Sequence, residues 1–225
     1  MKKNLWIIFF LSALAVYIAG IQMPDQTIQY ICKPLLMPLL MAWFIVSVKG
    51  ISTDLKTWII GALFFSWAGD VLLMFEAKGK VFFMLGLSSF LIAHIFYILF
   101  FHYVRIRENV KGNPWLMVIV VIYYGSLITL LSPYLGDMKW PVRVYGIVIS
   151  FMFMLAMHML FIKNKIAGKW MMAGALLFVV SDSVLAINKF YQPFGKAGIV
   201  IILTYGLAQL FIVNGAIKYI RNSNN

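Results

Sequence analysis

Eight apolar runs determine what this chain can fold into. The hydrocarbon core of a bilayer is about 30 Å thick, so a helix needs about 20 apolar residues to cross it. The runs cover residues 4–20, 31–48, 57–75, 80–103, 115–131, 141–162, 169–187 and 197–219. Only 12% of the 225 residues are charged, about half of what a water-soluble protein carries. The sequence predicts an all-α protein, a polytopic membrane bundle of eight transmembrane helices in a single domain over residues 1–225.

The basic residues lie mainly between the runs, where membrane topology rather than nucleic-acid binding explains them. If the N-terminus is cytoplasmic, the inner segments carry 12 of the 19 Lys and Arg residues and the outer segments carry 7. Cytoplasmic segments of membrane proteins are rich in Lys and Arg. We therefore expect a multi-pass protein of the cell membrane with both termini in the cytoplasm. The poor cleavage site YIAG at residues 17–20 indicates that the first run is a retained signal anchor.

Metal and disulfide chemistry have little support in the sequence. Cys32 is the single cysteine, so it has no partner for an intrachain disulfide. The three histidines do not form the zinc-binding pattern H-E-x-x-H. We therefore expect no metal site and no cofactor.

Two carboxylates lie inside apolar runs, whereas the other five acidic residues lie in polar segments or at their edges. Asp70 lies in GALFFSWAGDVLLMF, residues 61–75, and Asp182 lies in GALLFVVSDSVLAINKF, residues 174–190. A charged group deep in a bilayer costs about 2.5–3.5 kcal/mol on insertion scales, so an intramembrane acid indicates a functional site. The structural alternative is a pair of buried carboxylates that hold helices together through cations or hydroxyls. We favour the functional interpretation.

Both carboxylates are predicted at a similar depth. An even number of crossings separates the third and seventh runs, so these runs point the same way, and Asp70 and Asp182 fall near the same membrane face. Lys33 starts the second run on that face, while His94 and Gln209 lie deeper. The sequence therefore predicts a polar pocket that opens to one side of the membrane.

The two halves of the chain resemble each other at an offset near 112 residues. Asp70 and Asp182 differ by 112 positions, and AHIF at residues 93–96 resembles AQLF at residues 208–211. This offset is consistent with two parallel four-helix halves. Short apolar stretches also match by chance.

Five further polar residues accompany the two acids. His94 and Tyr97 share a helix face at i and i+3, where an interhelical hydrogen bond competes with a catalytic role. Gln209 has the same two interpretations. Tyr145 is either a pocket residue or an interfacial aromatic. Arg143 is more typical of a topology anchor than of a ligand contact.

The second run combines a cation with two prolines. Lys33 either snorkels to the headgroups or contacts a phosphate or carboxylate in the pocket. Pro34 is expected near the start of the helix, where proline is tolerated. Pro38 is expected to kink the helix or to leave its first turn irregular.

Two acids in an apolar pocket favour three kinds of chemistry. Low dielectric favours the neutral form of a carboxylic acid, and a second carboxylate nearby favours it further for one of the two. The pair would then share a proton, with one acid and one base or electrostatic stabiliser. Hydrolysis through an oxocarbenium-like state fits this arrangement, as do peptide hydrolysis and proton-coupled transport.

The protease and transporter interpretations each lack a feature. Intramembrane aspartyl proteases use G-x-G-D and Y-D, but Trp67 replaces the first glycine and Ser181 replaces the tyrosine. A transporter should have interrupted helices in corresponding positions of both halves. Pro34 and Pro38 have no counterpart inside the sixth run. Proton-coupled transport stays open as an alternative.

The order of these residues along the chain resembles a known family. The matching positions are Lys33-Pro34, Gly69-Asp70 with VLLM at residues 71–74, Phe90-x-x-x-His94-x-x-Tyr97, Tyr145, Phe178-x-x-Ser181-Asp182-x-x-Leu185-Ala186 and Gln209. In order and placement they resemble the YhhN-like lysoplasmalogenases, over nearly the whole chain. The resemblance implies an eight-helix membrane enzyme that hydrolyses the vinyl ether of lysoplasmalogens to a fatty aldehyde and glycerophospho-ethanolamine or -choline.

The resemblance also implies roles for individual residues. It places the two catalytic aspartates of the family on Asp70 and Asp182. One would protonate the vinyl ether, and the other would stabilise the cation and activate water. The expected substrate-binding residues are Lys33, which would hold the lipid phosphate, with His94, Tyr97, Tyr145 and Gln209. The expected partners are a lysophospholipid, water and membrane lipids, with no obligate protein partner. Another ether- or ester-linked lysolipid stays open as the substrate.

Overall fold

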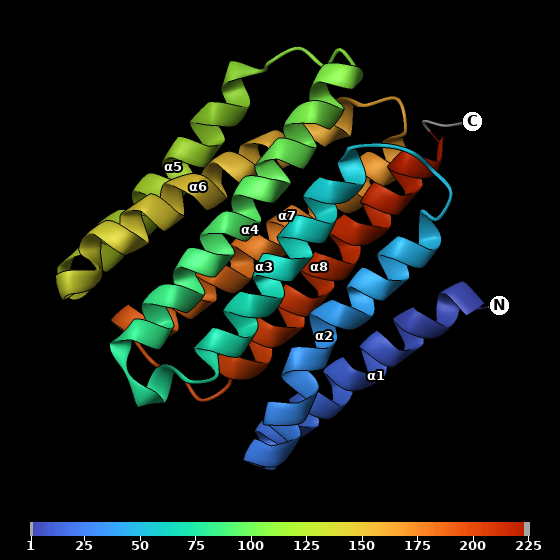
Figure 1. Ribbon diagram of the computed structural model, residues 1–225. Helices are drawn as coiled ribbons and strands as arrows, with labels where there is room; N and C mark the ends of the chain where they lie inside the picture. The colour runs from blue at the N-terminus through green and yellow to red at the C-terminus, as the bar shows by residue number, and fades with distance from the viewer. Residues whose placement is uncertain (1, 223–225) are drawn as a thin grey trace.

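The computed structural model describes residues 2–222, with the side chains of residues 2–4 left out. Within this part of the chain there are eight long helices and no strand (Figure 1). The helices are α1 (Lys2–Gln22), α2 (Gln26–Ser47), α3 (Leu55–Leu73), α4 (Lys80–Arg107), α5 (Pro114–Leu131), α6 (Lys139–His158), α7 (Lys165–Ala186) and α8 (Ala197–Asn222). All eight are long and apolar enough to cross a membrane. The predicted all-α, multi-pass membrane fold is confirmed.

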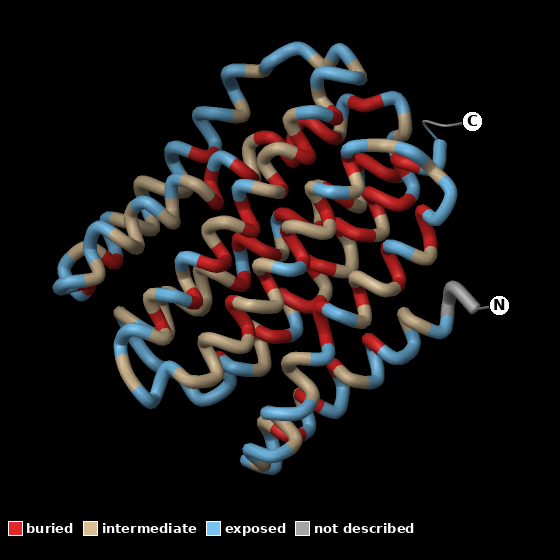
Figure 2. The backbone as a smooth tube through the Cα atoms, in the orientation of Figure 1, coloured by how far each residue is buried: buried red, intermediate tan, exposed pale blue. Residues whose placement is uncertain are grey.

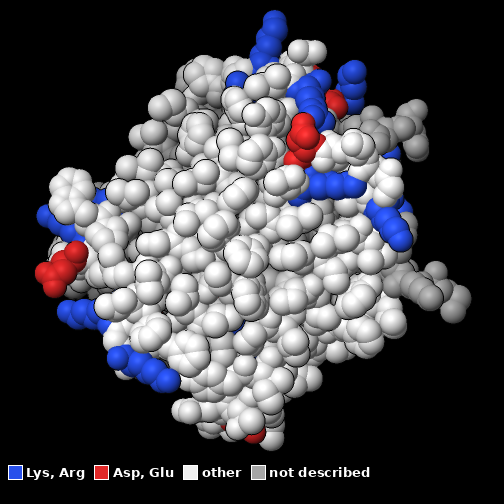
Figure 3. Space-filling model, viewed as in Figure 1, with Lys and Arg blue, Asp and Glu red and all other residues white. Residues whose placement is uncertain are grey.

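Consecutive helices run in opposite directions, so the C-terminal ends of α1, α3, α5 and α7 gather at one end of the bundle (Figure 1). We call this end the site end. Lysine, arginine and acidic side chains gather toward the two ends of the helices and leave between them a broad band almost free of these charges (Figure 3). Such a band is what a bilayer requires of the surface that faces it. The two four-helix halves, the single domain, the cell membrane and the cytoplasmic termini stay predictions.

The second helix begins five residues earlier than the apolar run predicted. The side chain of Asp25 caps it by accepting hydrogen bonds from the backbone N–H groups of Thr27 (2.8 Å) and Ile28 (3.2 Å). As a result Pro34 and Pro38 lie inside a continuous helix, and the expectation that Pro34 lies at the helix start is wrong. The other helix ends lie within four residues of the predicted limits.

The two prolines tie α2 to α3. Pro38 has no N–H, so the carbonyl oxygen of Pro34 has no donor four residues ahead. The indole Nε1 of Trp67 on α3 donates to this oxygen instead, at 3.1 Å. This bond satisfies the free carbonyl in the apolar interior and fixes α3 beside the segment of α2 that carries Lys33.

Glycine lets α7 and α8 approach until their backbones touch. A Cβ atom at Gly174 would lie 2.7 Å from the carbonyl oxygen of Ala208, and one at Gly215 would lie 2.8 Å from that of Ala167. Small residues serve this purpose in membrane helices generally. The close contact places the acid of α7 beside the polar face of α8.

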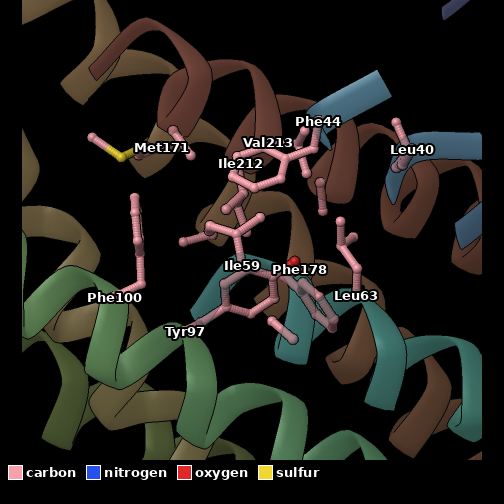
Figure 4. Packing of buried hydrophobic residues seen from close by; sticks show 14 of the residues in the cluster. Leu40, Phe44, Ile59, Leu63, Tyr97, Phe100, Met171, Phe178, Ile212 and Val213 are labelled. Atoms are coloured by element: carbon pink, nitrogen blue, oxygen red, sulfur yellow. The ribbon is translucent and has the colours of Figure 1, made fainter. Parts of the chain in front are cut away.

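Apolar side chains fill the middle of the bundle, farther from the site end than the polar residues. Buried positions face inward along every helix, while exposed positions lie outside and at the ends (Figure 2). The centre is packed by large side chains from five helices (Figure 4): Leu40, Phe44, Ile59, Leu63, Tyr97, Phe100, Met171, Phe178, Ile212 and Val213. This core holds the helices that carry the candidate site at fixed distances from one another.

Candidate functional site

Asp70 and Asp182 line the same cavity, of about 90 Å³, near the site end of the bundle. Its polar lining comes from five helices: Lys33 on α2, Asp70 on α3, Tyr145 on α6, Ser181 and Asp182 on α7, and Tyr205 on α8. Leucine, isoleucine and phenylalanine side chains form the rest of the wall. The cavity therefore combines two carboxylates with a low-dielectric surrounding.

Asp70 has a cation and a hydroxyl as partners. The carboxylate is buried, with Nζ of Lys33 at 3.9 Å from Oδ1. The hydroxyl of Tyr205 donates to Oδ2 at 2.8 Å. The Lys33 side chain is 17% exposed, so this lysine points into the bundle and pairs with Asp70. Because a buried charge is stable only when it is paired, each of the two ionic groups depends on the other.

Asp182 belongs to a chain of three side chains from three helices. The hydroxyl of Tyr145 donates to Oδ2 of Asp182. Nε2 of His94 lies 2.9 Å from the same hydroxyl and 3.5 Å from Asp182 Oδ2. Since Tyr145 has one hydroxyl proton and gives it to Asp182, the proton between His94 and Tyr145 belongs to Nε2. The result is a relay from His94 through Tyr145 to Asp182.

The other nitrogen of His94 has no partner of its own among the described residues. His94 is fully buried, and its Nδ1 makes no hydrogen bond within residues 2–222. The imidazole is therefore held in the relay through Nε2 alone.

Tyr97 and Gln209 bond to each other behind the cavity wall. The Tyr97 hydroxyl donates to Oε1 of Gln209, and Nε2 of Gln209 donates to Oγ of Ser66 at 3.0 Å. All three residues are buried, and in the described chain none of them lines the cavity. They join α3, α4 and α8 directly behind the site.

Phe178 fills the space between the two groups of polar residues. Its ring centroid lies 4.7 Å from that of His94 and 5.5 Å from that of Tyr205, in edge-to-face contact with both. The ring lies one turn before Asp182 on α7. Edge-to-face packing of this kind restricts ring orientation, which keeps the partners of both carboxylates in place.

Tyr205 is the site residue that the sequence analysis missed. It lies one turn before Gln209 on α8, a spacing that puts both side chains on one helix face. That spacing was the available signal. Tyrosine is ordinary in membrane helices near an interface, so the residue type alone did not distinguish it.

Arg143 takes no part in the cavity. Its Nη2 donates to Oγ of Ser132 at 3.3 Å, and its guanidinium lies 5.7 Å from the ring centroid of Trp140. These contacts lie at the start of α6 and hold it to the end of α5. They are typical of an anchor at the membrane surface, the interpretation that the sequence favoured.

Comparison with known proteins gives a family for this chain and several relatives that share the name lysoplasmalogenase. A sequence model described as the YhhN family matches residues 28–216. The human protein named lysoplasmalogenase TMEM86B is 30% identical over 219 residues, which cover 95% of this chain and 87% of that protein. Human lysoplasmalogenase TMEM86A is 29% identical over 194 residues, covering 81% of this chain and 76% of that protein.

Bacterial proteins carry the same description. A lysoplasmalogenase of Mycobacterium tuberculosis is 27% identical over 163 residues, which cover 71% of this chain and 60% of that protein. No solved structure matches the chain significantly.

Proposed function

Since this chain belongs to the YhhN family, we propose that it is a membrane hydrolase that cleaves the vinyl ether of lysoplasmalogens. The products are a fatty aldehyde and glycerophospho-ethanolamine or -choline. Relatives named lysoplasmalogenase, similar over most of the chain, support this reaction. The observation that carries the mechanism is the single cavity lined by both Asp70 and Asp182.

We assign the general acid to Asp182 and the general base to Asp70. The Lys33 ammonium, 3.9 Å from Asp70, favours the carboxylate form there. The partners of Asp182 are the Tyr145 hydroxyl and the His94 imidazole; neither is a lysine or an arginine, and these partners accommodate a protonated acid.

The reaction proceeds in three steps that restore both acids. Asp182 gives its proton to the second carbon of the alkenyl chain: the double-bond electrons form the new carbon–hydrogen bond, and the first carbon and the ether oxygen are left as an oxocarbenium ion. Water attacks the first carbon and gives a proton to Asp70, which yields a hemiacetal. The hemiacetal hydroxyl then returns a proton to Asp182 while the carbon–oxygen bond to glycerol breaks, and Asp70 protonates the departing alkoxide.

Aldehyde release from a purified lysoplasmalogen tests this function. We expect mass spectrometry to detect free fatty aldehyde, and in D₂O the aldehyde should carry one deuterium on its second carbon. The saturated alkyl-ether lysolipid has no double bond to protonate and should remain intact. Cleavage of the ester-linked lysolipid alone would make the chain an esterase. Proton flux in sealed vesicles without any covalent change would instead indicate transport.

Tyr205→Phe should lower kcat by roughly tenfold to a hundredfold, with little change in KM. The hydroxyl fixes the orientation of Asp70, and small misplacements of catalytic groups cost up to about a hundredfold in rate. Steady-state kinetics of aldehyde release give kcat and KM separately. Tyr219→Phe is the matched control, because that hydroxyl donates to Glu108 at the opposite end of the bundle. Unchanged kcat in Tyr205→Phe would contradict a positioning role for Tyr205.

A further inference from the structure

Tyr145 and Asp182 face a second space, on the side away from Asp70. A cavity of about 40 Å³ lies between α5, α6 and α7 and is lined by both residues. Its remaining wall is mostly apolar and includes Leu127, Ile128 and Leu131 of α5 with Val142 and Ile149 of α6. We call this space the α5–α7 groove. Tyr145 and Asp182 therefore border both the cavity that contains Asp70 and this groove.

The groove spans the level of the acid: Val142 and Ala186 line it toward the site end, and Ile149 lines it toward the middle of the membrane. Ile149 lies one turn beyond Tyr145 on α6, which is about 5.4 Å farther from the site end. Tyr123, whose hydroxyl lies 2.7 Å from Oγ of Ser183, borders the groove on α5. The cations Lys33 and Lys189 lie toward the site end, each lining a cavity that also reaches Asp182. The cations that fit a phosphate therefore border the other cavities at Asp182, whereas this groove offers mainly apolar side chains.

The helix that closes the groove has few buried residues. Within α5, Val120 and Leu131 are the buried residues, whereas Trp115, Met117 and Ile122 are exposed. Helix α5 lies at the edge of the bundle beside α6 (Figure 1), and most of its length is half-buried or exposed (Figure 2). Lipid therefore lies on the other side of this single helix. A small outward movement of α5 would open the groove to the bilayer.

We propose that the α5–α7 groove receives the hydrocarbon chain of the lipid substrate and that Gly146 sets how much chain it holds. This inference rests on the proposed function, since a lysoplasmalogen has one alkenyl chain attached at the carbon that reacts. With the vinyl ether at Asp182, that chain must continue into apolar surroundings, and the groove is lined by Asp182. The cavity as it stands is too small for a whole chain, so binding displaces α5.

Gly146 of α6 lines the groove opposite Tyr124 of α5. A Cβ atom at this position would lie 2.9 Å from Cε2 of Tyr124, and a larger side chain would extend into the groove. Leu127 lines the groove from the α5 side. Substitutions at the two positions narrow the same space from opposite walls. They leave untouched the carboxylates and the hydroxyls that we place in the reaction.

The test compares chain lengths. Gly146→Leu and Leu127→Phe should each lower kcat/KM for long-chain lysoplasmalogens by roughly tenfold or more, because one methylene in a filled pocket already changes rates this much. Short-chain lysoplasmalogens should react at nearly the wild-type rate. Gly125→Leu on α5 is the matched control, since a Cβ atom there meets nothing within 4 Å. Its chain-length profile should equal that of the wild type.

Failure of the groove and failure of the reaction give different results. If the wild type releases aldehyde and both narrowed variants keep its chain-length profile, the groove is not the chain site. If the wild type releases no aldehyde, the proposed function fails. Displacement of a fluorescent lysolipid by non-hydrolysable alkyl-ether lysolipids of several lengths then tests the groove alone, with equal displacement curves for wild type and variants overturning it.

Discussion

Asp182→Asn should reduce aldehyde release by about 10²–10⁴-fold, the contribution typical of a general acid. Asparagine has nearly the shape of aspartate, but its amide cannot deliver a proton to carbon. Asp70→Asn should cause a loss of similar size, because water then attacks without a base. Kinetics of the purified variants measure both effects. Asp137→Asn is the control, since Asp137 has a 97% exposed side chain outside the site and should leave the rate unchanged.

Deuterium exchange separates the roles of the two aspartates. In D₂O the Asp70→Asn variant still protonates the double bond, and the oxocarbenium ion can revert before water captures it. Unreacted lysoplasmalogen recovered from this variant should therefore carry deuterium on the second alkenyl carbon. Lysoplasmalogen recovered from the Asp182→Asn variant should carry no deuterium at that carbon. The reverse pattern would exchange the two roles, and wild-type rates in both variants would rule out the paired-acid mechanism.

The fold could be predicted because hydropathy and length alone decide which segments cross a bilayer. The limits of the helices depend on other interactions. The apolar pattern placed the start of the second helix at residue 31, but the cap at Asp25 places it at Gln26. A capping side chain and its polar neighbours lower the hydropathy of the first helical turn. A boundary drawn from hydropathy therefore assigns this turn to the preceding loop.

The two acids could be found because a carboxylate in an apolar run stands out in composition. Their partners could not be assigned, because these depend on how each helix is rotated about its axis. Nothing in the sequence pairs Lys33 with Asp70 or directs His94 through Tyr145 to Asp182. Tyr97 and Gln209 were recognised as polar, yet their bond to each other follows only from how α4 and α8 are placed in the bundle.

Lys33→Met should destabilise the protein by up to about 3–5 kcal/mol, the cost of leaving one partner of a buried ion pair without the other. The Asp70 carboxylate would keep the Tyr205 hydroxyl but lose its counter-charge. Adding Asp70→Asn to the same chain removes the stranded charge and should restore most of the stability. Thermal unfolding of the purified single and double variants in detergent measures this cycle.

The chain contains a matched pair for this experiment. Lys80 and Asp137 are also 3.9 Å apart, but their side chains are 93% and 97% exposed. An exposed pair contributes little because solvent screens it, so Lys80→Met and Asp137→Asn should show no measurable coupling. Equal coupling in the two cycles would mean that Asp70 does not depend on Lys33 for its charge balance.

The same double variant tests whether Lys33 also holds the lipid phosphate. In Asp70→Asn the lysine remains, whereas in Lys33→Met/Asp70→Asn both charges are gone, so neither chain strands a buried carboxylate. If Lys33 contacts the phosphate, the double variant should bind a non-hydrolysable alkyl-ether lysolipid more weakly than Asp70→Asn does. Equal affinities would restrict Lys33 to its pairing with Asp70, because the lysine would then be needed only by the carboxylate beside it.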